Sequence, residues 1–243
     1  MKKNKIYDIL IIILLYIGIS CLPFDLIPVP SFVHYIFKIL AQVAIIIFIR
    51  YFLKKSPLSK DVQKKNSISI VWFIPLFIVC FSNFFCLIDK NNSVVFSFDI
   101  DLIFAIMLSL FIAYNEEYIF RMLLIDNLNT DKPIMKILIS STIFAACHLS
   151  HFLSSFNPVD LIDVVYTFFI GIILGLIFVY TNKFVFVYLF HASYNVINGD
   201  FSRYWIHFGS ASNSFYLINI TVGIIAAVYI VLIYFIKLRK ESK

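Results

Sequence analysis

Hydrophobic residues gather along this chain into eight long stretches, separated by short polar segments. Each stretch approaches the roughly 20 apolar residues that a helix needs to cross a hydrocarbon layer about 30 Å thick. The pattern predicts an all-α fold, a polytopic membrane bundle of about eight transmembrane helices. The predicted helices cover residues 6–22, 32–53, 68–88, 100–124, 134–152, 161–180, 184–198 and 215–236.

The composition agrees with a membrane protein. Of the 243 residues, 61% are hydrophobic and 14% are charged, whereas soluble domains are about 45–50% apolar. A net charge of +6 would suit a nucleic-acid partner, but most Lys and Arg residues lie between alternate helices, as the positive-inside rule requires of cytoplasmic loops. We therefore expect no nucleic-acid partner, both termini in the cytoplasm, and one integral domain over residues 1–243, multi-pass in the cell membrane.

The fourth predicted helix contains charged residues that are expensive in a bilayer. Insertion of an ionisable side chain costs at least about 2.5 kcal/mol, so a cluster of them indicates function. Glu117 and Arg121 are four residues apart and face each other, which predicts a salt bridge between them. Glu116 points about 100° away and is expected to face a polar cavity, where a carboxylate suits general-base catalysis. Lys38, early in the second helix, is expected to snorkel outward.

Two further helices carry polar residues at helical spacing. Phe144 lies one turn before His148, and His191 lies one turn before Asn195. The second pair presents two hydrogen-bond donors on one face, an arrangement that suits a developing oxyanion. Polar side chains also join helices in membranes, and that is the structural alternative. Because the whole set exceeds what helix packing needs, we expect a water-containing cavity between the fourth, fifth and seventh helices, opening on the cytoplasmic side of the bilayer midplane.

The sixth predicted helix carries Gly171 and Gly175 in a GxxxG pattern. Two small residues one turn apart let a neighbouring backbone approach closely. The pattern predicts tight packing against another helix, and we assign it no chemistry.

These motifs resemble those of the CPBP family of intramembrane endopeptidases, also called the Abi family, which includes CAAX proteases and bacteriocin-processing proteins. The family pattern is EExxxR, FxxxH and HxxxN on successive helices. This chain has Glu116-Glu117-x-x-x-Arg121, then Phe144-x-x-x-His148, then His191-x-x-x-Asn195. Each motif alone is weak, but the three in this order are specific. The resemblance covers a catalytic core of about residues 100–198.

The resemblance implies an enzyme that hydrolyses a peptide bond of a membrane-associated peptide or protein. It implies that Glu116 activates a water molecule with help from His148. It further implies that His191 and Asn195 stabilise the oxyanion, while Glu117, Arg121 and Phe144 support the site. Peptide or bacteriocin processing, or self-immunity, would be the biological setting. The lipid bilayer and a peptide or membrane-protein substrate are the expected partners, and the oligomeric state is open.

Two alternatives stand beside this interpretation. Glu116, His148 and His191 would suit a two-His, one-carboxylate zinc site, but the chain has neither HExxH nor HxxEH, so we expect no metal to be required. A non-enzymatic membrane protein is the other alternative. It would be a transporter that relays protons through glutamate and histidine, or a bacteriocin-immunity protein that acts by binding.

Overall fold

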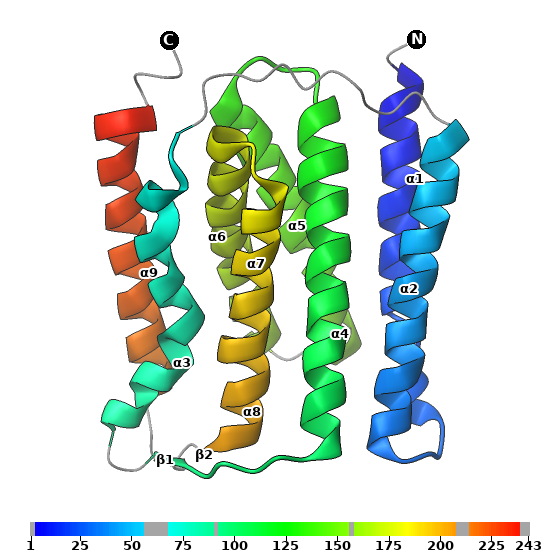
Figure 1. Ribbon diagram of the computed structural model, residues 1–243, viewed down its shortest axis with the longest axis vertical. Helices are drawn as coiled ribbons and strands as arrows, with labels where there is room; N and C mark the ends of the chain where they lie inside the picture. The colour runs from blue at the N-terminus through cyan, green and yellow to red at the C-terminus, as the bar shows by residue number, and fades with distance from the viewer. Residues whose placement is uncertain (1–2, 56–67, 90–91, 156–157, 208–213, 239–243) are drawn as a thin grey trace.

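The computed structural model describes residues 3–55, 68–89, 92–155, 158–207 and 214–238. Within these ranges the protein is a bundle of long helices that run roughly along one axis (Figure 1). The α-helices are α1 (Lys3–Ser20), α2 (Ser31–Lys55), α3 (Ser82–Phe85), α4 (Ile100–Glu117), α5 (Pro133–Ser155), α6 (Pro158–Thr181), α7 (Phe184–Ser193), α8 (Ser202–Trp205) and α9 (Ser214–Ile233). The 3₁₀ segments are η1 (Phe24–Leu26), η2 (Ile70–Phe81) and η3 (Cys86–Ile88), and the π-helical segments are η4 (Tyr118–Ile125), η5 (Tyr194–Phe201) and η6 (Tyr234–Leu238).

Every one of the eight predicted stretches is helical, so the prediction of an all-α polytopic bundle is confirmed. Within the described ranges, four helices are long and apolar enough to cross a membrane, at Ser31–Tyr51, Ile70–Ile88, Ile100–Ile125 and Asp163–Thr181. Shorter apolar helices cover Ile6–Ser20, Pro133–Leu149 and Ile220–Ile236. Large apolar side chains such as Leu14, Ile47 and Val165 are exposed on the outside of the bundle. Such a surface is stable against lipid and costly against water.

The third predicted helix departs from ideal α geometry. The helix begins at Ile70, and its first twelve residues, Ile70–Phe81, form the 3₁₀ segment η2, with Pro75 inside it. Proline has no backbone N–H and disrupts regular α-helical hydrogen bonding around it. Hydropathy detects this helix, but it does not report how tightly the helix is wound.

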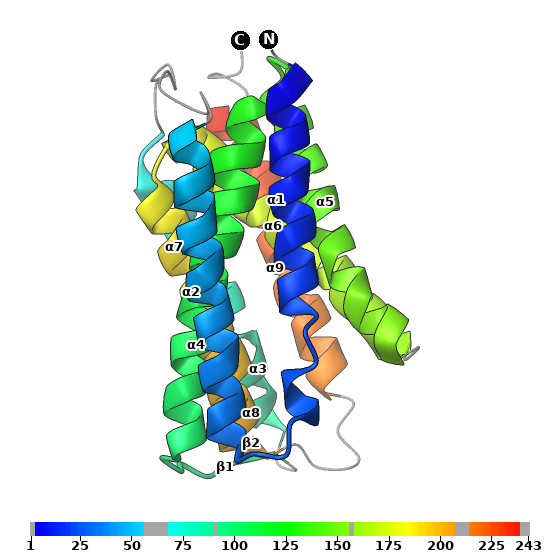
Figure 2. The ribbon, with the colours of Figure 1, turned by 90° about the vertical axis from the view of Figure 1, so that its right-hand side faces the viewer.

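The helices α5 and α6 pack closely, and both glycines of the GxxxG pattern lie in their contact. A Cβ atom added to Gly171 would lie 3.1 Å from the Ser141 Cα and 3.2 Å from a ring carbon of Phe144. One added to Gly175 would lie 3.0 Å from the Cγ2 of Ile137. The expected packing role is confirmed. Figure 2 shows α5 inclined to the other helices, with α6 behind it.

The start of α1 and the end of η6 lie at the same end of the bundle (Figure 1), as an even number of crossings requires. That this end faces the cytoplasm stays a prediction. At the opposite end, β1 (Ser93–Val94) and β2 (Ile206–His207) pair as antiparallel strands. Two-residue strands are too short to give a periodic pattern, and the sequence did not predict them.

Two apolar clusters hold the described helices together. One joins α6, α7, α9 and η2 and includes Phe190, and the other joins α1, α2 and η4 and includes Ile119 and Phe120. In the sequence, the charged residues of the fourth helix are next to Ile119, which belongs to the second cluster. His191 directly follows Phe190, which belongs to the first. The polar cluster predicted from sequence therefore lies where the two apolar clusters meet.

Candidate active site

The predicted salt bridge between Glu117 and Arg121 is present and completely buried. Arg121 Nε lies 3.2 Å from Glu117 Oε2, and neither side chain is exposed. The guanidinium group also lies over the ring of Phe144, with Cζ 4.7 Å from the ring centroid. Its Nη2 donates a long hydrogen bond of 3.4 Å to the carbonyl oxygen of Gly171. Arg121 thus ties α4 and η4 to α5 and α6 beneath the site.

His191 reaches both adjacent glutamates. Its Nδ1 lies 2.7 Å from Glu117 Oε1, and its Nε2 lies 3.5 Å from Glu116 Oε2. Glu117, ionised against Arg121, can only accept, so the Nδ1 of His191 carries a hydrogen and donates it. A carboxylate that accepts a hydrogen bond from Nδ1 sets the direction of the imidazole ring. The sequence predicted His191 and Glu117 as site residues, but it did not predict this contact.

Glu116 receives a hydrogen bond from a residue that no motif indicated. The hydroxyl of Tyr16, on α1, donates to Glu116 Oε1 at 2.8 Å, and both side chains are buried. Glu116 faces the cavity described below, as predicted. Its two oxygens are directed by Tyr16 on one side and by His191 on the other.

Phe144 and His148 form the third part of the site. Nδ1 of His148 lies 3.0 Å from the carbonyl oxygen of Phe144. A carbonyl only accepts, so Nδ1 is the donor, and Nε2 of the neutral ring carries the lone pair. The Phe144 ring packs edge-on against both histidines, 5.0 Å from His148 and 5.9 Å from His191 between centroids. Phe144 is therefore a spacer that sets the positions of both imidazoles.

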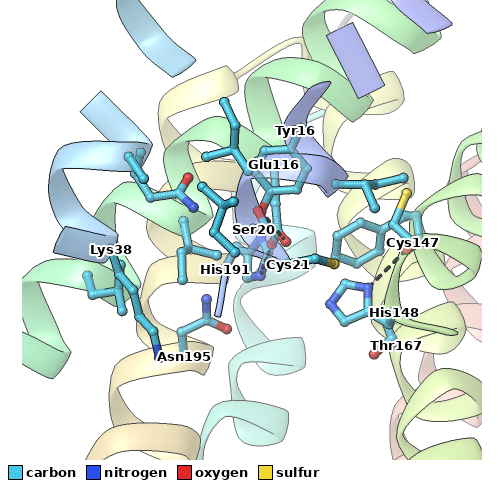
Figure 3. Close-up of a pocket in the computed structure, with 18 of the residues that line it drawn as sticks. Tyr16, Ser20, Cys21, Lys38, Glu116, Cys147, His148, Thr167, His191 and Asn195 are labelled. Atoms are coloured by element: carbon cyan, nitrogen blue, oxygen red, sulfur yellow. Dashed lines mark hydrogen bonds and ion pairs between the residues drawn. The ribbon is translucent and has the colours of Figure 1, made fainter. Parts of the chain in front are cut away.

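These side chains meet at a cavity of about 630 Å³. Glu116, His148, His191 and Asn195 all line it, and Figure 3 shows them around a common space. Phe144 lines it too, whereas Glu117 and Arg121 are not among its lining residues. The catalytic set predicted from three separate helices is thus brought together, and the two ion-paired residues lie behind it.

The cavity reaches beyond the three helices predicted. It is lined by α1, α2 and α6 as well as the three helices predicted, and its lining reaches residues 21–24, in the connection from α1 to α2. That connection lies toward the end of the bundle opposite the termini (Figure 2), so the cavity extends in that direction, and the side of the membrane on which it opens stays a prediction. Lys38 lines the cavity too, and its expected snorkelling toward the outer membrane surface stays a prediction.

Two of the three helices that carry the motifs change from α to π winding at the site. The change follows Glu117 in the fourth helix and Ser193 in the seventh. Segments of π-helix are rare and occur often at functional sites. Here they contain Arg121 and Asn195, so the altered winding sets the direction of a motif side chain in each of the two helices.

The proposed zinc ligands were compared with the geometry. Among the residues that the structure describes, no three His, Cys, Asp or Glu side chains are grouped so as to hold a metal ion. The two ring nitrogens of His191 already face Glu117 and Glu116. Glu116, His148 and His191 therefore do not fit the alternative ligand set, and we derive no step through a metal.

The fold and the site define a class, a polytopic α-helical membrane protein with a glutamate and histidine centre between its helices. Residues 98–197 match the family described as Rce1-like, type II CAAX prenyl endopeptidase Rce1-like. The resemblance to the CAAX protease family is thereby confirmed over this part of the chain, which contains all three motifs. The description of that family names an endopeptidase, a hydrolase of peptide bonds. No curated protein and no solved structure matches the chain.

Tyr16 lies outside the matched region, and its hydrogen bond gives a testable prediction. We expect Tyr16→Phe to keep the buried ring and to lower kcat about 10-fold with little change in KM. The reason is that a hydrogen bond to a charged group contributes about 1.5–3 kcal/mol, and this one orients Glu116. Peptide cleavage kinetics would measure the effect.

The control for this substitution is Tyr180→Phe. Tyr180 is buried, and its hydroxyl has no hydrogen-bond partner within the described part of the chain. An unchanged kcat in Tyr16→Phe, or an equal loss in both variants, would contradict a role for the Tyr16 hydroxyl.

Proposed function

We propose that the protein is an intramembrane endopeptidase in which Glu116 activates water for attack on a peptide bond. One observation carries the proposal. Glu116, His148, His191 and Asn195, from three different helices, line one cavity, and the surrounding contacts hold both imidazoles in defined orientations. A packing role would need the polar side chains to bond one another, and it would not need a cavity between them.

The first step is proton removal from a water molecule between Glu116 and His148. The lone pair on His148 Nε2 accepts one hydrogen bond from the water and orients it. Glu116 takes the other hydrogen as a proton, while the water oxygen forms a bond to the scissile carbonyl carbon. A positioned general base of this kind contributes about 100-fold to 10,000-fold to the rate.

The second step is stabilisation of the oxyanion by His191 and Asn195. In its imidazolium form, His191 donates Nδ1–H to Glu117 and directs Nε2–H toward Glu116. When Glu116 accepts the proton, it loses its charge, and its attraction for the Nε2–H of His191 weakens. This hydrogen is then available to the oxyanion. Asn195, one turn away, supplies a second donor through its side-chain amide. Preorganised donors are effective because they need no reorientation during the reaction.

The tetrahedral intermediate then collapses. The carbon–nitrogen bond breaks, and the proton held by Glu116 passes to the leaving nitrogen, so that a carboxylic acid and an amine are formed; the acid then loses its proton to water. Glu116 returns to its ionised state with Tyr16 as donor. Arg121 stays paired with Glu117 throughout, and no net charge accumulates beneath the site.

The test is cleavage of a peptide library by purified protein in lipid nanodiscs, carried out in ¹⁸O-labelled water. We expect one label in the new carboxylate, a large loss of cleavage in His148→Ala, and full activity after chelation. Absence of cleavage by the folded wild-type protein would overturn the proposal. Loss of activity on chelation with recovery on adding zinc would overturn the metal-free mechanism.

A further inference from the structure

A second cavity, of about 760 Å³, lies beside the first. We call it the apolar cavity, because most of its wall consists of apolar side chains from α6 and α9, among them Phe169, Ile173, Ile224 and Ile230. Phe169 and Ile224 are exposed on the outside of the bundle. The apolar cavity is therefore open toward the bilayer.

Four residues line both cavities: Tyr166, Ile170, Tyr194 and Asn195. The rings of Tyr166 and Tyr194 lie 6.2 Å apart between centroids. A single layer of side chains thus separates the catalytic cavity from the apolar cavity. Asn195, the proposed oxyanion donor, belongs to this layer.

We propose that the apolar cavity binds an apolar segment of the peptide substrate next to the scissile bond. This inference rests on the proposed function. A scissile carbonyl oxygen held by Asn195 lies at the boundary between the two cavities. An extended peptide advances about 3.3 Å per residue, so residues two or three positions from the bond reach past the boundary into the apolar cavity.

Polar groups in the wall of the apolar cavity favour a peptide over a lipid chain. Asp200 lines the apolar cavity, and its buried Oδ2 has no hydrogen-bond partner among the described residues. A peptide backbone has an N–H group at nearly every residue that can satisfy this oxygen, whereas a hydrocarbon chain has none. Burying such an acceptor without a partner costs about 1–3 kcal/mol.

Hydrogen bonds hold the part of the cavity wall that contains Asn83 and Asn198 in place. Asn198 Oδ1 accepts hydrogen bonds from Ser82 Oγ at 3.0 Å and from the Asn83 backbone nitrogen at 2.7 Å. The side chain of Asn83 in turn donates to the Asn198 carbonyl oxygen at 2.7 Å. These bonds fix α3 against η5, so this part of the apolar cavity is preformed, as small binding sites usually are.

Filling the apolar cavity tests the proposal. A Cβ atom at Gly223 meets nothing within 4 Å, so Gly223→Phe places a ring in the cavity without a backbone clash. Ala227→Phe, one turn further along α9, is the second variant. The matched control is Gly18→Phe on α1, where a Cβ atom also meets nothing within 4 Å and the position lines neither cavity.

Each protein is tested on two peptides that share the residues at the cleavage site. One continues into a leucine-rich segment, and the other into a serine and glutamine segment. We expect wild-type protein to prefer the leucine-rich peptide, and both cavity variants to lower its kcat/KM about 10-fold, as loss of apolar binding does. Cleavage of the polar peptide should be unchanged, and Gly18→Phe should resemble wild type on both.

Equal losses on the two peptides in both cavity variants, or no loss on either, would overturn the proposal. The second result would assign the apolar cavity to membrane lipid. Failure of wild-type protein to cleave any peptide would instead remove the proposed function, so the two failures are distinguishable.

Discussion

Glu116→Gln is expected to lower kcat by about 100-fold to 10,000-fold, the contribution of a positioned general base. The amide has the size of the carboxylate, and its oxygen can still accept the hydrogen bond from Tyr16. It cannot take a proton from water. Because Glu116 acts on water and not on the bound peptide, KM should change little. Steady-state cleavage kinetics in nanodiscs would measure both constants.

The control is Asp131→Asn, which neutralises an exposed acidic residue in the turn between η4 and α5. It should leave both constants unchanged. A Glu116→Gln protein with wild-type kcat would eliminate Glu116 as the base. A protein that has lost its fold would show a lowered thermal midpoint, which separates that outcome from loss of catalysis.

Combining Glu116→Gln with His148→Ala tests whether the two residues act as a unit. Residues that serve one step are non-additive, and removing both costs about as much as removing one. We therefore expect the double variant to be no slower than Glu116→Gln. If the double variant instead lost activity by the product of the two single-variant factors, His148 would act in a separate step.

The parts of this molecule that could be predicted from sequence are those set by local spacing. Hydrophobic length gave the positions of the helices, because a bilayer imposes a minimum length on each. Helical periodicity gave the Glu117 and Arg121 pair, because residues four apart share one face. Both results depend on residues that are close in the chain.

The contacts that periodicity could not predict join residues far apart in the chain. Tyr16 and Lys38 reach the cavity from α1 and α2, which carry no motif, so no spacing related them to Glu116. To predict the hydrogen bond from His191 to Glu117, one would need to know how α4 and α7 are positioned relative to each other along the bundle axis. The π winding at Tyr194 also escaped detection, because hydropathy does not distinguish α from π geometry.

The buried Arg121 is expected to have the largest effect on stability. Arg121→Met should lower the free energy of unfolding by about 3–5 kcal/mol, because it leaves Glu117 as a buried charge without its cation. Methionine keeps most of the side-chain volume, so cavity formation contributes little. The measurement is reversible unfolding in mixed micelles. Arg50→Met, at an exposed arginine of α2, is the matched control and should change stability by no more than about 0.5 kcal/mol.

The double variant Glu117→Gln with Arg121→Met separates stability from catalysis. Removing both charges eliminates the unpaired ion, so much of the lost stability should return, with a coupling energy of about 0.5–3 kcal/mol between the two positions. Activity should not return, because an amide at residue 117 no longer holds His191 as an ionised acceptor does. Recovery of both stability and kcat would show that the pair only supports the fold. No recovery of stability would show that Arg121 acts mainly through Phe144 and Gly171.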